Sequence, residues 1–146
     1  MQLTSPDFEG GQPLPLTAGL KRENRRPSLR ISDVPAGANN LAVLVYDPDA
    51  PNGNFTHWLA WNIPPATIEL NSDNLPAGVV QGTNDLGNSR WDGPAPPGGT
   101  HHYHFVLLAL SAPLNLPASA SRKAFDQKVQ TSTIEKVELV GLYSAD

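Results

Sequence analysis

LAVLVYDPDAPNGNFTHWLAWNI, residues 41–63, predicts two β-strands joined by a turn-rich loop. Residues 41–46 are a short apolar run rich in β-branched side chains, which is too short for a helix and is typical of a buried strand. The run ends in residues 47–54, whose Pro, Asn and Gly content predicts a turn. Residues 56–63 form a second apolar strand that closes at two prolines. This segment therefore favours a β-sheet protein.

The second half of the chain adds two strands and one helix to this prediction. Residues 101–110 and 137–143 have the apolar content of strands. A helix is expected over about Arg122 to Gln130, and either Ser119 or Ser121 can cap its first turn.

Composition supports one β domain. Of the 146 residues, 15 are Pro and 12 are Gly. Proline is excluded from helix interiors and from central ladder positions, so a protein of long helices is excluded. The sequence predicts a single, mainly all-β domain over residues 1–146, with two packed sheets, a late helix and an irregular segment at residues 1–40. Cis bonds occur at roughly 5–6% of X–Pro bonds, which predicts about one here, and we expect it at Ala50–Pro51.

Charge and cysteine content exclude several classes of function. The 10 Lys and Arg residues and the 14 Asp and Glu residues give a net charge of −4, which argues against bulk electrostatic binding to DNA or RNA. The absence of cysteine excludes disulfides, thiolate catalysis and Cys-ligated metals. No apolar run is long enough for a membrane span, and the first residues lack the features of a signal peptide. We therefore expect a cytoplasmic protein.

The basic residues are unevenly distributed. Half of them lie in one decapeptide, at Lys21, Arg22, Arg25, Arg26 and Arg30. A charge run of this kind is usually a solvated loop. The alternative is a contact surface for an acidic partner.

Three residues with side chains suited to acid, base or ligand chemistry lie where predicted strands begin or end. Asp47, His57 and His101 each stand beside a turn rich in Pro or Gly, which is where sites on β scaffolds are usually built. Each also has a structural explanation, since Asp before Pro is a common turn residue and a strand His is often a packing residue. Two histidines and one carboxylate could also hold a metal, which keeps an enzyme among the hypotheses.

Strand alternation separates the remaining histidines from these candidates. Side chains two residues apart share a face of a strand, so His101 and Tyr103 share one face, and His102 and His104 share the other. No nucleophile motif and no phosphate-cradling glycine loop is present.

Several segments, in this order, resemble the phosphatidylethanolamine-binding protein family, which includes the Raf kinase inhibitor protein. The motifs are DPDAP at 47–51, HW at 57–58, NIP at 62–64, GTND at 82–85, GPAPP at 93–97 and HHYHF at 101–105. The compact length and the ending ELVGLY at 138–143 are similar to its bacterial and archaeal branch. The chain departs from the family pattern at His102, where relatives usually have Arg.

The resemblance implies an antiparallel β-sandwich of two packed sheets, with one or two short helices near the C-terminus and a small pocket for phosphate-like anions. It places six residues in the pocket: Asp47, Asp49, His57, Ala95, His101 and Tyr103. Ala95 would contribute its backbone N–H, and Asp47 would either orient a histidine or receive the ammonium group of a ligand.

The expected function is the binding of a small anion such as phosphate or phosphorylethanolamine, without a metal or other cofactor. The resemblance also implies a regulatory or inhibitory role toward a kinase or protease, and a homodimer is the assembly we expect if the chain associates. The alternatives are an acid/base or metal-assisted enzyme that uses Asp47, His57 and His101, and a purely structural protein.

Overall fold

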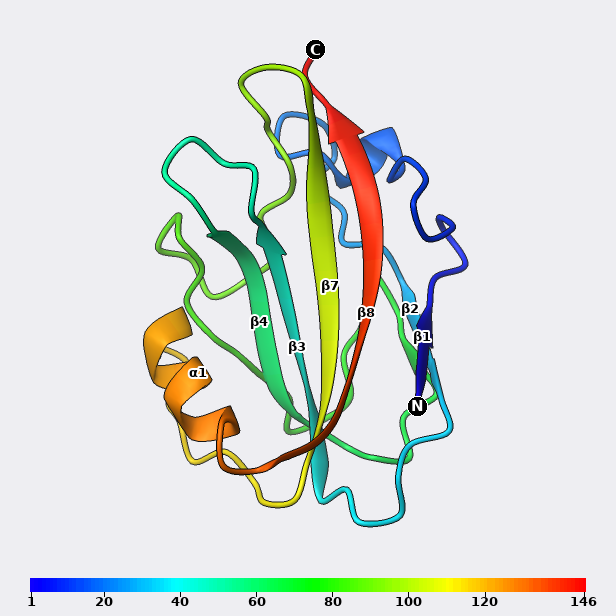
Figure 1. The fold of residues 1–146 in the computed structure, drawn as a ribbon, viewed down its shortest axis with the longest axis vertical. Helices are drawn as coiled ribbons and strands as arrows, with labels where there is room; N and C mark the ends of the chain where they lie inside the picture. Colours follow the sequence, from blue (N-terminus) through cyan, green and yellow to red (C-terminus); the bar gives the residue numbers. More distant parts are fainter.

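A five-stranded sheet forms the larger layer of the protein (Figure 1). The computed structural model describes all residues from 1 to 146. Every strand pair in this sheet is antiparallel. Its strands, in spatial order, are β6 (Val80–Gln81), β4 (Phe55–Ile63), β3 (Asn40–Asp47), β7 (Thr100–Leu110) and β8 (Thr133–Ser144).

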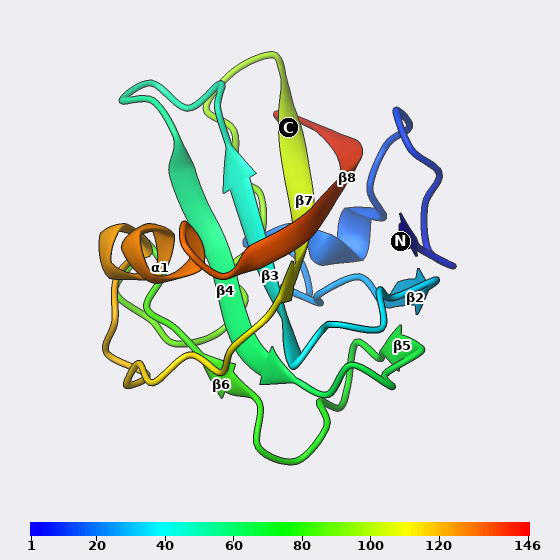
Figure 2. The ribbon, with the colours of Figure 1, turned by 60° about the horizontal axis from the view of Figure 1, so that its bottom comes forward.

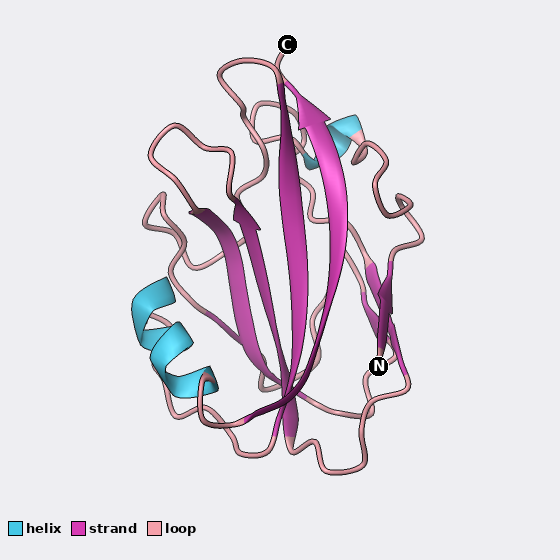
Figure 3. Ribbon diagram, viewed as in Figure 1, coloured by secondary structure: helices cyan, strands magenta, loops and turns pink.

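A three-stranded antiparallel sheet packs over one face of the larger sheet, and a helix packs over the other, as Figure 2 and Figure 3 show from two directions. The smaller sheet has the order β1 (Gln2–Thr4), β2 (Leu29–Ser32), β5 (Glu69–Leu70). The helix α1 (Arg122–Val129) begins at Ser121, whose side chain accepts a hydrogen bond from the Ala124 N–H. A 3-10 turn, η1 (Leu16–Ala18), lies between β1 and β2.

The predicted sandwich and its late helix are therefore confirmed, and the long strands lie where the apolar runs predict them. The prediction of an irregular segment at residues 1–40 was wrong, because β1 and β2 lie within it. These strands are only three and four residues long, which leaves too little alternation to recognise. The Ala50–Pro51 prediction was also wrong, since every peptide bond in the structure is trans.

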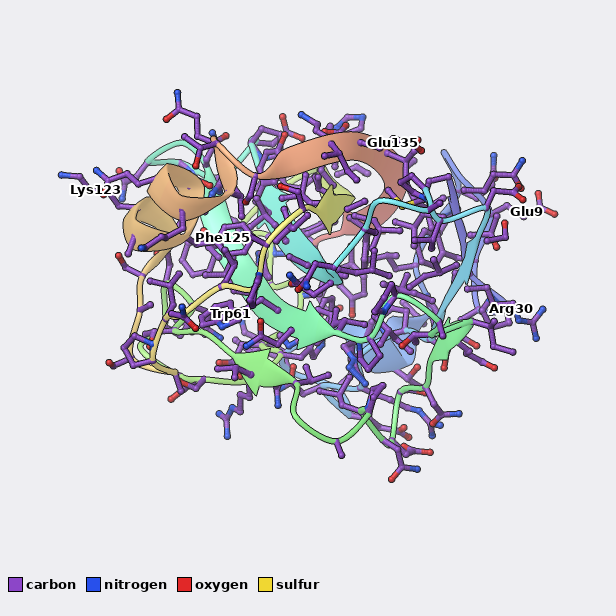
Figure 4. All side chains as sticks on the ribbon, turned by 90° about the horizontal axis from the view of Figure 1, so that it is seen from below. Glu9, Arg30, Trp61, Lys123, Phe125 and Glu135 are labelled. Carbon is purple, nitrogen blue, oxygen red and sulfur yellow. The ribbon has the colours of Figure 1, made fainter.

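Each face of the larger sheet has its own apolar core. Between the sheets, Leu29 and Ile31 of β2 pack with Val43, Val45 and other side chains of the larger sheet. On the opposite face, the Trp61 and Phe125 rings lie 5.9 Å apart, which joins β4 to α1 (Figure 4). Strand alternation supplies both cores, since successive side chains point to opposite faces.

No helix of the structure is both long enough and apolar enough to cross a membrane.

Candidate functional site

A cavity of about 260 Å³ opens at the end of the larger sheet where β3 ends and β4 and β7 begin, which is the upper end in Figure 1. Its walls are largely apolar, with a few polar groups between them. Its lining residues are Leu20, Asp47, Ala50, Pro51, Phe55, His57, Leu86, Gly93, Ala95, Pro96, Pro97, His101 and Tyr103. Five of the six residues expected in a pocket are thus brought together from four separate parts of the chain.

Asp47 and His101 form a buried pair in this cavity. Their strands are neighbours in the sheet, and Oδ2 of Asp47 lies 2.6 Å from Nδ1 of His101. The other carboxylate oxygen, Oδ1, accepts a hydrogen bond from the Asp49 N–H at 2.8 Å. Both oxygens of Asp47 therefore have protein partners, which fits the role of orienting His101 better than that of receiving a ligand's ammonium group. With Nδ1 held by the carboxylate, Nε2 of His101 has no partner in the protein.

A β-bulge sets the orientation of His57. Val45 pairs with Trp58 and Tyr46 pairs with Thr56, so His57 is the extra residue of β4 at this point. Strict alternation would place the His57 ring on the α1 face of the sheet. The bulge instead brings it into the cavity, where its centroid lies 5.3 Å from that of Tyr103.

A backbone carbonyl fixes the His57 ring in this position. Nδ1 of His57 lies 2.6 Å from the carbonyl oxygen of Asp92 and donates to it, which leaves Nε2 without a protein partner. The ring is buried, and burial lowers the pKa of His57 below its ordinary value although the Asp92 contact acts in the opposite direction. The neutral imidazole is therefore the favoured form of the empty site.

Asp92 itself is completely buried and lies at the centre of a hydrogen-bond network behind His57. Its carboxylate accepts hydrogen bonds from the side chains of Asn24, Asn84, Asn88 and Arg90, at 2.8–3.2 Å. Burial alone would raise the pKa of Asp92, but these donors together hold it below its ordinary value. The network was not predicted from the sequence, because Asn and Asp in a turn-rich segment look like ordinary turn residues.

Tyr103 closes the cavity from the β7 side. Its side chain is almost fully buried, and its ring stacks against that of His101 at a centroid distance of 6.5 Å. Burial and the nearby Asp47 carboxylate raise the pKa of Tyr103 far above its ordinary value. The phenol is therefore neutral at all physiological pH values.

The segment Gly93–Pro97, which we call the proline wall, forms one side of the cavity. Proline has no N–H, so only Gly93 and Ala95 carry backbone donors in this segment. The Gly93 N–H donates to Oδ1 of Asn24 at 2.7 Å. No hydrogen bond within the protein uses the Ala95 N–H, so it is the donor of the wall that is free for a ligand.

Asp49 does not line the cavity, in contrast to the expectation from the family resemblance. Its carboxylate accepts hydrogen bonds from the backbone N–H of His102 at 2.8 Å and from Nδ1 of the same residue at 2.7 Å. These contacts hold the pKa of Asp49 below its ordinary value and fasten the β3–β4 loop to β7. The side chain thus turns outward to His102, at the position where this chain departs from the family pattern.

The apolar part of the lining, of which Leu20, Phe55 and Leu86 are the larger members, was not predicted from the sequence. Single apolar residues in turn-rich segments carry no periodic signal. No group of three or more His, Asp or Glu side chains in the structure is arranged to hold a metal ion. Asp47, His57 and His101 therefore do not form the three-ligand metal set that was one of the hypotheses.

The fold and the cavity define a β-sandwich protein with a small, largely apolar cavity at the end of its larger sheet. The chain belongs to the phosphatidylethanolamine-binding protein family, whose sequence profile matches residues 4–144.

Relatives come from bacteria and archaea. A UPF0098 protein of Pyrococcus horikoshii is 43% identical over 125 residues, and the match covers 80% of this chain and 63% of that protein. The chain thus spans less than two thirds of that relative. A Mycobacterium tuberculosis protein named as the lipoprotein LppC is 36% identical over 145 residues, covering 98% of this chain and 72% of that protein. The crystal structure of a phosphatidylethanolamine-binding protein homolog from Chlamydia trachomatis superposes with a TM-score of 0.93 at 31% identity, and covers 99% of this chain and 97% of that chain.

Proposed function

We propose that the cavity binds a small oxyanion, such as inorganic phosphate or the phosphate group of phosphorylethanolamine. The observation that carries this proposal is the arrangement of two imidazole rings, His57 and His101, each held at Nδ1 by a protein acceptor. Each ring therefore has Nε2 left for a ligand. With the Ala95 N–H, the cavity has three separate groups that can donate to phosphate oxygens once the rings are protonated.

The electrostatics of the site favour proton uptake when an anion binds. Burial keeps His57 neutral in the empty cavity. A dianion beside the ring would stabilise the imidazolium form, because an opposite charge within about 4–6 Å favours the charged state of a titrating group. The protonated Nε2 then donates a charge-assisted hydrogen bond, which is stronger than a neutral one. The negative charge of the Asp47 carboxylate acts in the same direction, because it raises the pKa of His57.

The size of the cavity limits the ligand. About 260 Å³ lies at or below the lower end of the roughly 300–1,000 Å³ that is usual for small-molecule sites. A phosphate with a short substituent fits this volume. We therefore place the phosphate and a small headgroup inside the cavity and any larger part of a lipid outside it.

An NMR titration with inorganic phosphate and with phosphorylethanolamine tests the proposal. The ring resonances of His57 and His101 should shift saturably, and His104 should remain nearly still because it packs against Tyr46 on the opposite face of the sheet. Equal shifts at all four histidines, or none at millimolar ligand, would contradict the assignment.

A second candidate function, acid/base catalysis, is favoured by one observation. A carboxylate that orients an imidazole, as Asp47 orients His101, is a common way to prepare a general base. Turnover of small phosphate esters and carboxylic esters, lost in a His101→Gln variant, would support this function. Anion-dependent thermal stabilisation without turnover supports binding instead.

A regulatory role toward a kinase or protease and a cytoplasmic location remain predictions from the sequence, as does a homodimer. Inhibition assays with purified kinases and proteases, cell fractionation and sedimentation of the purified chain test them separately.

A further inference from the structure

A polar groove of about 590 Å³ lies outside the cavity and shares no lining residue with it. It is formed by residues 23–26, which lie in the decapeptide that holds half of the basic residues, by residues 72–75, by Gln81 and by residues 90–91. Only Leu75 and Trp91 in its lining are apolar. Because the walls of small-molecule sites are usually mostly apolar, this groove suits a ligand that is itself rich in polar groups.

Arg26 is the unusual residue of this groove. Its side chain is buried, with only 7% of the residue exposed, and its guanidinium lies 4.6 Å from the centroid of the Trp58 ring. It donates one hydrogen bond, from Nη2 to the backbone carbonyl oxygen of Asn71, and its buried Nε has no partner. No carboxylate of the protein forms an ion pair with it, although buried charges are normally paired.

The other charged groups of the groove are already in use or lie at its rim. Arg25 pairs with Asp73 at 3.1 Å, and Arg90 pairs with Asp92 at 3.1 Å. Burial lowers the pKa of Arg26 to about 10, which leaves the guanidinium charged at neutral pH. The groove therefore holds one buried positive charge without a direct counter-ion.

The geometry points to a binding site for a small polar carboxylate, with the carboxylate as the missing counter-ion of Arg26. A planar carboxylate matches the planar guanidinium, which presents several N–H groups in a fixed fork. The Asn74 side chain and the side-chain NH₂ group of Gln81, both in the lining, can bond hydroxyl or amino groups on the same ligand. The acidic residues Glu23 and Asp73, also in the lining, would repel a dianion more strongly than a monoanion, which favours a carboxylate over a phosphate.

Sodium glycolate is a suitable probe, with glycolamide as its neutral counterpart, in NMR titrations at constant ionic strength. Glycolate should shift the Arg26 Nε–H and the Trp58 indole N–H saturably, since that indole donates to Gln81 in the groove at 2.8 Å. The Trp61 indole is an internal control, because it lies in the core on the α1 face. Glycolamide should produce no saturable shift.

Three variants make the test specific. Arg26→Gln should weaken glycolate binding by about tenfold or more, as expected for the loss of a hydrogen-bonded charge. Arg30→Gln makes the same change of charge on β2, outside the groove, and should leave the affinity unchanged. If Arg26→Gln does not fold, Gln81→Glu should weaken glycolate binding in its place. The new carboxylate can still accept the hydrogen bond from the Trp58 indole, and its negative charge acts as an internal counter-ion that blocks glycolate.

Several results would overturn the inference. These are the absence of a saturable shift at millimolar glycolate, equal responses to glycolamide, and equal losses in Arg26→Gln and Arg30→Gln. Sulfate binding that depends on Arg26 and is tighter than glycolate binding would overturn the carboxylate class. The groove shares no lining residue with the cavity and His101 does not contact it, so a His101→Gln variant should bind glycolate in the groove with unchanged affinity.

Discussion

Nδ1 of His57 lies 2.6 Å from the backbone carbonyl oxygen of Asp92, whose own carboxylate is completely buried. One residue thus fixes a histidine of the cavity through its main chain and anchors a polar network through its side chain. The His57 ring is held in place by the backbone carbonyl of Asp92, which is still present after any substitution of the Asp92 side chain. Side-chain substitutions at Asp92 and at His57 therefore test different properties of the site.

The first prediction concerns pH. Burial puts the folded pKa of His57 below the value of about 6.5 expected in the unfolded chain. Between the folded pKa and about pH 6.5, the unfolded state then binds more protons at His57 than the folded state does. The contribution of His57 to the free energy of unfolding is therefore full above about pH 6.5 and falls as the pH is lowered toward the folded pKa. The slope reaches at most about 1.4 kcal/mol per pH unit. Denaturant melts across this range measure it, and a His57→Asn variant, which can still donate to the Asp92 carbonyl, should have a flatter profile.

The same histidine predicts how anion affinity depends on pH. Sulfate stays a dianion over the whole interval, so any change in its affinity reports on the protein. Sulfate should bind more tightly as the pH falls from about 8 to about 6, because the bound anion favours protonated imidazole. Calorimetry in buffers of different ionisation enthalpy should show net proton uptake. A sulfate affinity that is independent of pH would contradict the role of the histidines.

His101 and Leu107 lie on the same strand and are expected to respond in opposite ways. His101→Gln should reduce anion affinity by about tenfold or more while costing little stability, because glutamine can still donate to Asp47. Leu107→Ala should cost about 2–5 kcal/mol of folding, because the Leu107 side chain is fully buried in the core between the sheets. Its anion affinity should be unchanged. Paired denaturant melts and anion titrations check both outcomes, and a His101→Gln protein that binds normally would place the site elsewhere.

Asp92→Ala should cost about 1–3 kcal/mol, since it leaves the buried Asn84 amide, the half-buried Asn24 and Asn88 amides and the exposed Arg90 without their acceptor. Asp92→Asn keeps one oxygen acceptor and should cost less. The Asp92 carboxylate also predicts a loss of stability at acid pH. Its folded pKa lies below the ordinary value of about 4, so its stabilisation is lost as the pH falls through that region, and the Asn variant should lack this loss. Equal stabilities of wild type and Asp92→Ala would contradict the network.

The proline wall gives a prediction with a matched control. A Cβ atom at Gly93 would lie 1.8 Å from the carbonyl oxygen of Ala18, whereas one at Gly98 would meet nothing within 4 Å. Gly93→Ala should therefore displace the proline wall. It should lower the free energy of unfolding by about 1–3 kcal/mol and should also weaken anion binding. Gly98→Ala should stay within about 0.5 kcal/mol of wild type. Thermal melts with and without sulfate distinguish the two variants.

The sequence predicted the parts of this protein that have strong periodic patterns or marked turn chemistry. The hairpin over residues 41–63 and strand β7 follow from apolar runs bounded by Pro and Gly. The short strands β1 and β5 could not be recognised, because two or three residues carry no period and their pairing is decided by packing against the larger sheet.

The candidate site was only partly accessible to sequence reasoning. The positions of Asp47 and His101 follow from where their strands end and begin. The orientation of His57 does not, because it depends on a bulge that strict alternation excludes. The outward position of Asp49 depends on His102 across the sheet, a contact between residues far apart in the chain.

The proline wall has a further consequence for how a ligand would be received. Three of its five residues are prolines, whose φ angles are fixed by the ring. Ordering a flexible residue on binding costs roughly 1–2 kcal/mol of conformational entropy, and most of that cost is already absent from this segment before any ligand arrives. The free donor of Ala95 is therefore preorganised, and we expect the backbone of this side of the cavity to superpose closely in free and anion-bound structures.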